Sequence, residues 1–469
     1  MSYTSRSALG AIRYEMASRL GHLPTSANPI IAERLARYHK PEDAFDESMI
    51  LERIVDADTL GQVHSPEIKY VVCVDGSGHE DQEAYDRYPS TRVLYMQIAG
   101  VFIDLRQMLE RTGPFVDPAR LADATESSVV SGFLPGSFLE HESFEDPDEA
   151  FRAEFFDLFA DTVIQQRTLL QLLLETQRYA RPHEASAAAR GNLLLTKCPN
   201  KKCSLNEPPR GYKGAPIPAL SMSKCAECGA NVWPTDALRI WEQFNSDDSN
   251  KQVLSRTSQV IEHLVLIGVA LGIEAMSPRM LQQTAFICDG DLALFGEPAR
   301  FQHGLRGCWQ EIMRRARLRG HQPPVVIGVA KSGYPVEHFH GIRRFVKRRH
   351  LMRLDDVYMT KRLRVRSLAE TYFGRKLFYH SADGQLLVST VVPETELAYG
   401  YGEADYSDFV RFPALSRALD VLDGIGTRLY DDALIPVALA HHWAAYPLAN
   451  AEKVLRMLTE RSVSSGESP

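Results

Sequence analysis

Apolar and polar positions alternate along the chain in two patterns that predict an α/β protein. Three short runs, 69–75, 284–288 and 324–330, are almost wholly apolar and rich in β-branched residues, as in strands buried on both faces. A further strand is predicted over 91–99, and a hairpin over 377–392 around the turn Ser381-Ala-Asp-Gly384. Because long helical stretches separate these strands, we expect an α/β core whose sites lie at the carboxyl ends of the strands.

Helical spacing of apolar residues fills most of the remaining chain. The longest such segment, 144–181, ends before Pro182 and predicts a single long helix. The other predicted helices are 8–20, 29–39, 48–60, 235–244, 250–271, 300–319, 415–428, 436–446 and 449–461.

Residues 198–228 interrupt this pattern with prolines and little periodicity, which indicates an inserted module. The expected organisation is an N-terminal helical region over 1–68, a first core segment with the long helix over 69–190, the insertion over 191–234, a second core segment over 235–462 and a disordered tail over 463–469.

Composition excludes several classes of protein. A chain of 469 residues that is 44% hydrophobic and carries 20 Phe and 18 Tyr can bury a large core and is not globally disordered. The longest apolar stretch, 264–273, is about half of what a bilayer span needs, and 1–20 lacks the core of a signal peptide. Seven cysteines are too few for a disulfide framework at this length. We expect a cytoplasmic protein.

Four of the cysteines form the most specific local motif. Cys198 and Cys203 are separated by four residues, and Cys225 and Cys228 form a CxxCG knuckle after a 21-residue spacer. Two such knuckles present four thiolates, the ligand set of structural tetrahedral zinc with no open position. We expect a zinc ribbon with about one zinc per chain.

Charge is strongly segregated although the net charge is only −7. Residues 300–366 carry 17 Lys and Arg against four acids, a net +13, so the rest of the chain carries −20. Residues 123–161 hold eleven acids and one Arg, with seven Phe among them, which is equally typical of a partner surface and of a solvated face. A dense basic block inside an acidic chain is typical of a localised track for a polyanion.

Two acidic residues follow buried strands at glycine-containing turns. Asp75 precedes Gly-Ser-Gly, and Asp289 precedes Gly290. Carboxylates delivered from neighbouring strand ends can share Mg²⁺ or Mn²⁺, which prefer hard oxygen ligands. Lys331 follows the third buried strand and places a cation at the same rim, and His441 and His442 lie in an apolar C-terminal helix.

These motifs resemble those of NurA-type nucleases, the metal-dependent DNA nucleases that pair with HerA-type hexameric translocases. VDGS at Asp75, DGDL at Asp289, GVAKS at Lys331 and Ala440-His441 after Pro436 occur in the order of that family. The resemblance spans 69–445 through short motifs, and the four-cysteine block has no counterpart in the minimal family pattern.

The resemblance implies a ribonuclease H-like core, a homodimer, Mn²⁺ or Mg²⁺ dependence and cleavage of DNA. It implies metal ligation by Asp75, Asp289, the C-terminal histidine and a glutamate on the preceding helix, and Lys331 would neutralise charge on the scissile phosphate. We assign the glutamate to Glu262, with Glu274 as the alternative, and the histidine to His441, with His442 as its rival.

The basic block then becomes the expected DNA track, with binding that does not depend on base sequence and weakens with salt. The residues of this block that we expect to bind DNA are Arg314, Arg315, Arg343, Arg344, Lys347 and Arg348.

Three hypotheses of function follow. The first is a DNA nuclease coupled to a HerA-like ATPase in DNA end processing or anti-phage defence. The second is a catalytically silent adaptor that holds a translocase on DNA through the ribbon. A nucleotide phosphotransferase is disfavoured because the chain has no GxxxxGK[ST] loop.

Overall fold

The computed structural model describes residues 4–6, 12–14, 28–38, 47–60, 67–82, 91–109, 118–365, 368–393, 412, 414–427 and 433–445. The chain divides into two compact units, Met1–Leu51 and Glu52–Pro469. The predicted helix over 449–461 and the predicted tail lie outside the described residues.

The described residues of the first unit form two short strands and two helices. Strand β1 (Thr4–Arg6) pairs antiparallel with β2 (Ile12–Tyr14), so the predicted helix over 8–20 is wrong where the chain is described. Helix α2 (Pro29–Leu35) confirms the second prediction: it begins after Asn28, whose side chain accepts from the Ile30 N–H, and has proline at its first position. Helix α3 (Glu47–Leu51) closes the unit.

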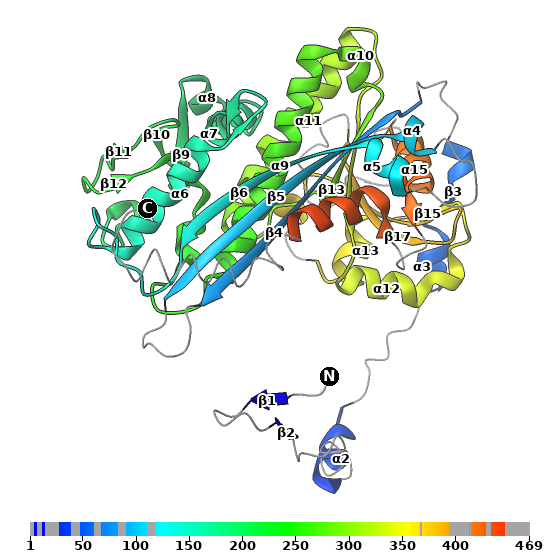
Figure 1. The fold of residues 1–469 in the computed structure, drawn as a ribbon, viewed down its shortest axis with the longest axis horizontal. Coiled ribbons are helices and arrows are strands. Elements are labelled where there is room, and N and C mark those ends of the chain that lie inside the picture. The colour runs from blue at the N-terminus through cyan, green and yellow to red at the C-terminus, as the bar shows by residue number, and fades with distance from the viewer. Residues whose placement is uncertain are drawn as a thin grey trace. The chain divides into compact units, whose positions relative to one another are not determined.

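A nine-stranded mixed sheet forms the centre of the second unit (Figure 1). Its order is β3 (Ile54–Asp56), β15 (His350–Arg353), β16 (Arg375–His380), β17 (Leu386–Val391), β14 (Val325–Ala330), β13 (Thr284–Asp289), β4 (Tyr70–Gln82), β5 (Arg92–Asp104) and β6 (Thr125–Pro135).

Five of these strands reproduce the ribonuclease H-like arrangement. In chain order they are β4, β5, β6, β13 and β14, and in space they follow the order third, second, first, fourth, fifth. Strands β4, β13 and β14 run parallel, and β4, β5 and β6 form an antiparallel ribbon. The predicted α/β class and this core are confirmed.

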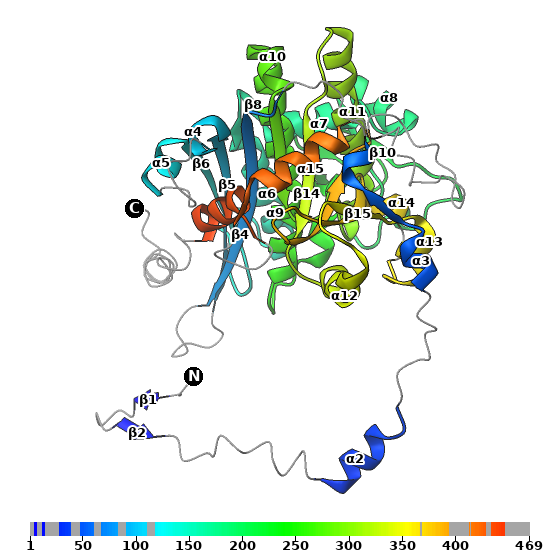
Figure 2. The ribbon, with the colours of Figure 1, turned by 90° about the vertical axis from the view of Figure 1, so that its right-hand side faces the viewer.

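Helices cover both faces of the sheet (Figure 2). One face packs on α9 (Lys251–Met276), α11 (Gln302–Leu318), α6 (Pro147–Asp161) and α7 (Leu169–Gln177). The other packs on α15 (Leu415–Gly424), the helix over 435–445 and α4 (Leu105–Leu109). By length and composition α9 could cross a membrane, but 72% of its most apolar window is buried inside the protein, as expected of a core helix.

Further described elements of the second unit connect these strands and helices. They are η1 (Ala57–Leu60), α5 (Pro118–Asp123), α8 (Pro182–Ala189), η3 (Pro234–Leu238), η4 (Ile240–Gln243), α10 (Pro278–Leu281), η5 (Glu297–Phe301), α12 (Tyr334–Ile342), η6 (Arg343–Phe345), α13 (Asp356–Lys361), α14 (Leu368–Thr371), β18 (Gly426–Thr427) and β19 (Ala433–Leu434).

The predicted long helix over 144–181 is wrong, because a tight hairpin divides it. Strands β7 (Val163–Ile164) and β8 (Arg167–Thr168) flank Gln165 and Gln166, both with positive φ. Thr168 then caps α7 reciprocally with Gln171. Glutamine is an uncommon residue for such a turn, so composition gave no turn signal there.

Several other predicted segments change character. The predicted helix over 48–60 breaks into α3, β3 and η1, and the segment 235–244 forms the short 3-10 turns η3 and η4 instead of an α-helix. The predicted hairpin over 377–392 is confirmed as β16 and β17.

Candidate functional site

The ladder between β4 and β13 sets two aspartates side by side. Cys288 pairs with Val74, and the next residues along the two strands are Asp289 and Asp75. Oxygens of both carboxylates and a ring nitrogen of His441 all lie within 4.8 Å of one another. The structure therefore brings together three residues that are separated by up to 366 positions in the sequence.

His441 reaches the strand from the helix over 435–445. Its Nδ1 lies 2.8 Å from Asp75 Oδ2, and 59% of its side chain is exposed. His442, the rival candidate, has its ring beside Trp443 at a centroid distance of 6.1 Å and is not a member of the three-residue cluster. Geometry favours His441.

Glu262 approaches from the opposite face of the sheet. It is buried on α9, and a Cβ added at Gly76 would lie 2.3 Å from its Oε1, so the glycine admits the carboxylate beside the strand. Glu262 lies just outside the 4.8 Å cluster. Glu274, the alternative, bonds Arg315 at 2.7 Å and Arg319 at 2.7 Å, twelve residues further along α9. Geometry favours Glu262.

Lys331 lies on the same rim, directly after β14. Its Nζ is 2.7 Å from Asp289 Oδ2, and about a third of its side chain is exposed. The cation therefore balances one carboxylate of the cluster and remains open to solvent.

Burial and mutual repulsion make the carboxylates reluctant to ionise. Burial, and then the charge of Asp289, raise the pKa of Asp75 to about 6, although the hydrogen bond with His441 opposes the shift. Burial, with the charges of Asp75 and Asp289, raises the pKa of Glu262 well above its usual range. An acidic cluster of oxygen and imidazole donors whose charge is only partly balanced fits a divalent cation such as Mn²⁺ or Mg²⁺.

A cavity of about 710 Å³ opens beside these carboxylates. Its walls are the part of β4 beyond Asp75 and one face of α9 that runs from Glu262 back to Lys251. Sequence reasoning missed the α9 residues of this face. The available signal was a polar stripe at helical spacing in an otherwise apolar helix, made by Lys251, Ser255, Ser258, Gln259 and Glu262.

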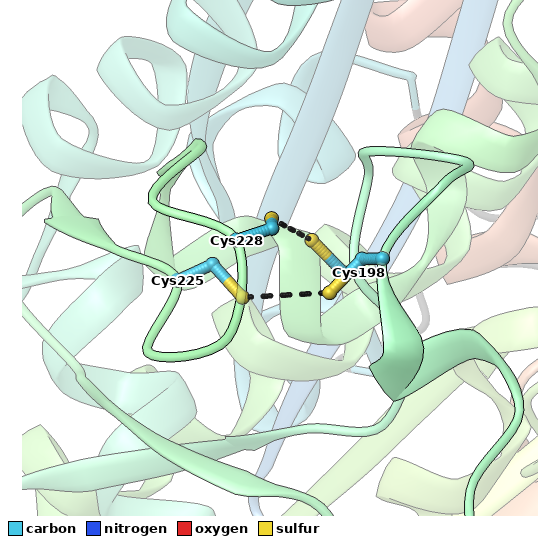
Figure 3. Close-up of side chains that lie close together, drawn as sticks. Cys198, Cys225 and Cys228 are labelled. Atoms are coloured by element: carbon cyan, nitrogen blue, oxygen red, sulfur yellow. Dashed lines mark hydrogen bonds between the residues drawn. The ribbon is translucent and has the colours of Figure 1, made fainter.

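The four cysteines of the predicted ribbon also meet in space (Figure 3). Cys198 and Cys228 have sulfurs 3.7 Å apart, and those of Cys203 and Cys225 are 3.8 Å apart. Four sulfurs at about 2.3 Å from a tetrahedral zinc are about 3.8 Å from one another. The cluster therefore has the dimensions of a zinc site, and a backbone N–H from Ala230 lowers the pKa of Cys228 to about 7, which favours the thiolate ligand.

The ribbon packs into the same core as the sheet. Its strands are β9 (Asn192–Leu195), β10 (Ala215–Pro218), β11 (Ser223–Lys224) and β12 (Asn231–Val232), with the short turn η2 (Ser204–Asn206). Arg152 of α6 donates to the Asn231 carbonyl at 3.0 Å and bonds Asp236 at 2.9 Å. Arg152 thus joins the acidic helix α6 to the ribbon through the Asn231 carbonyl, and to η3 through a buried ion pair with Asp236.

The aromatic residues of the acidic stretch divide between core and surface. Phe151 and Phe155 are fully buried against the sheet, whereas Phe133 and Phe138 are exposed. Part of the acidic stretch therefore packs into the core along α6 and does not form a solvated face.

The predicted DNA-binding residues fall into two groups. Arg314 and Arg315 on α11 are bonded to Glu311 and Glu274 respectively. The other four, Arg343, Arg344, Lys347 and Arg348, are exposed at or just after η6. Helix α12 leads from the Lys331 rim to this exposed group over about 14 Å.

Comparisons with known proteins give distant similarity among solved structures. No protein-family model matches the chain, and no curated protein matches it. Among solved structures, the NurA nuclease from Sulfolobus solfataricus aligns over 95% of this chain and 98% of its own, with 10% identity and a TM-score of 0.31. The residues of the site are therefore assigned from the geometry of the site itself.

The first prediction concerns the cysteine cluster. The purified chain is expected to carry about one zinc, and Cys225→Ser to lose it together with thermal stability, because the ribbon shares the core with β4 and β5. Elemental analysis and a melting curve measure both. Cys308→Ser, which changes a buried cysteine outside the cluster, is the control for zinc content, and a zinc-free wild type contradicts the assignment.

The second prediction concerns Asp75. Its folded pKa of about 6 lies above the ordinary 3.8, so its ionisation destabilises the metal-free fold fully above pH 6 and not at all well below pH 4. Asp75→Asn should raise the unfolding free energy of the metal-free protein at pH 8 by up to about 3 kcal/mol.

Denaturant unfolding at pH 8 and pH 4 measures this gain, which should fade at the lower pH. A variant that is less stable than wild type at pH 8 without metal would show that Asp75 is not under electrostatic strain.

Proposed function

We propose that the chain is a metal-dependent hydrolase of phosphodiester bonds in DNA. The observation that carries this proposal is the meeting of Asp75, Asp289 and His441 within 4.8 Å at the end of two parallel strands. Glu262 and Lys331 stand on either side of this cluster. No feature of the described residues favours the adaptor hypothesis, which gives the buried carboxylates no task.

Asp75, Asp289 and His441 would hold Mn²⁺ or Mg²⁺, with Glu262 as a further oxygen ligand. A cation bound there supplies Lewis acidity toward a phosphoryl oxygen and lowers the pKa of a bound water. The protein's own contribution is position and charge. Because Lys331 is partly exposed beside Asp289, its ammonium can face the non-bridging oxygens of the scissile phosphate.

His441 has two roles open to it. Its Nδ1 is held by Asp75, so the ring is fixed in orientation and its Nε2 is directed away from that bond. From there the ring can hold the cation or orient the attacking water.

The substrate proposal uses the exposed basic group at η6. Four cations at the end of α12, with no acid among 343–349, fit contacts to DNA phosphates that do not depend on base sequence. We further propose, on the resemblance of the sequence motifs alone, a homodimer that works with a HerA-like hexameric ATPase in DNA end processing or anti-phage defence.

The third prediction tests the hydrolase. Linear and plasmid DNA should be degraded with Mn²⁺, and Asp75→Ala or Asp289→Ala should lower the rate by roughly a hundredfold or more, because each removes an oxygen from the cluster. Agarose gels and release of acid-soluble nucleotide measure the rate.

Asp161→Ala is a matched control, since this aspartate is exposed at the end of α6 and away from the cluster. Equal activity in all four proteins would remove the proposed site, and calorimetric binding of Mn²⁺ would be lost with the activity in the two cluster variants only.

A further inference from the structure

A second cavity, of about 590 Å³, lies between the ribbon and the start of α6. Its walls are the first cysteine knuckle, the second knuckle with β12, the first turn of α6 and Trp241 of η4. It shares no residue with the carboxylate cluster or with the cavity beside that cluster. Its volume lies within the range of binding pockets in proteins, about 300–1,000 Å³.

Two walls of this cavity carry opposite charges. The ribbon contributes three ammonium groups and the start of α6 contributes three carboxylates, from Lys201, Lys202, Lys224, Asp146, Asp148 and Glu149. The acids lie at the N-terminal end of their helix, where the helix dipole stabilises negative charge. In the described part of the chain, these lysines form no ion pair with these acids.

Asn231 connects the two walls at one edge of the cavity without neutralising either of them. Its side-chain N–H donates to Glu149, and its side-chain oxygen accepts from the ammonium of Lys224. The loops that bear the lysines are held by the four-cysteine cluster, whose members flank them. The fold therefore sets the separation of the walls, and the other two acids and two lysines are exposed to solvent.

Two groups that line the cavity have unmet interactions. Arg152 is only 6% exposed, and its Nε is buried without a hydrogen-bond partner among the described residues, since Nη1 makes its contacts with the ribbon and η3. Burial, and then the charge of Asp146, raise the pKa of Asp148, although Lys201 and Arg152 oppose the shift. An acceptor placed near Arg152 and a cation placed near Asp148 would relieve both.

These features specify a ligand that carries charges of both signs. A polyanion would be attracted by the lysines and repelled by the three carboxylates, and a polycation would meet the reverse. A free amino acid offers one charge of each sign, whereas the cavity offers three. In an extended peptide, successive side chains point to opposite sides, so a sequence of alternating charge presents one sign to each wall.

We propose that the cavity between the ribbon and α6 binds an extended segment of a partner protein in which basic and acidic residues alternate. The basic side chains of this segment contact the acids of α6, and its acidic side chains contact the lysines of the ribbon. The ribbon and the acidic stretch thereby form a docking site for a protein, separate from the carboxylate cluster and independent of the hydrolysis proposed there.

The test is binding of a fluorescein-labelled hexapeptide of alternating lysine and glutamate to the full chain, measured by anisotropy at low salt. It should bind about tenfold more tightly than a hexapeptide of lysine alone or of glutamate alone. Asp148→Asn and Lys202→Gln each remove one ion pair and should weaken binding by up to about fivefold. Lys213→Gln changes an exposed lysine of the same ribbon outside the cavity lining and should leave binding unchanged.

Lys202→Glu gives a result that a loss of structure cannot imitate, namely weaker binding of the alternating peptide together with tighter binding of the lysine hexapeptide. Zinc content and melting temperature equal to those of the wild type show that each variant is folded. Three results would overturn the inference: no binding of the alternating peptide by the wild type, equal binding by the wild type and both single variants, or competition by an oligothymidylate as strong as that by the unlabelled peptide.

Discussion

The register of the parallel ladder between β4 and β13 is the constraint on which the candidate site depends. Because Cys288 pairs with Val74, the next residue on each strand is an aspartate, and the sheet holds the backbone of the two residues side by side. Glu262 adds a third buried acid over Gly76. Lys331 and His441 offset part of the repulsion, and a divalent cation would offset the rest. Repulsion between buried carboxylates therefore destabilises the folded chain at the position where the proposed chemistry needs a cation.

The four-cysteine cluster stabilises a different part of the structure. Three of its cysteines, Cys198, Cys203 and Cys225, belong to the core that β4, β5, α6 and α7 share, and Arg152 of α6 donates to the Asn231 carbonyl of the ribbon. Lysines of the ribbon, Lys201, Lys202 and Lys224, line a cavity opposite the acids at the start of α6. The ribbon therefore lies over the acidic start of α6. It contributes no residue to the carboxylate cluster.

Much of this was predictable from sequence where a pattern maps directly onto geometry. Buried parallel strands read as unbroken apolar runs, so the strands bearing Asp75 and Asp289 and their α/β setting were predictable, as was the CxxCG knuckle. The hairpin inside 144–181 was not, because Gln165 and Gln166 adopt positive φ without the usual turn residues. The cavity between β4 and α9 was not, because it depends on how closely α9 approaches Gly76 and Gly78, which only tertiary packing determines. The pairing of Arg315 with Glu274 was hidden for the same reason.

The most direct test of the account is anomalous diffraction from crystals soaked in Mn²⁺. The account predicts a manganese peak bonded to carboxylate oxygens of both Asp75 and Asp289, with His441 or Glu262 completing the protein ligands. A protein that binds manganese elsewhere, or not at all, with Asp75 and Asp289 in separate surroundings, would contradict it.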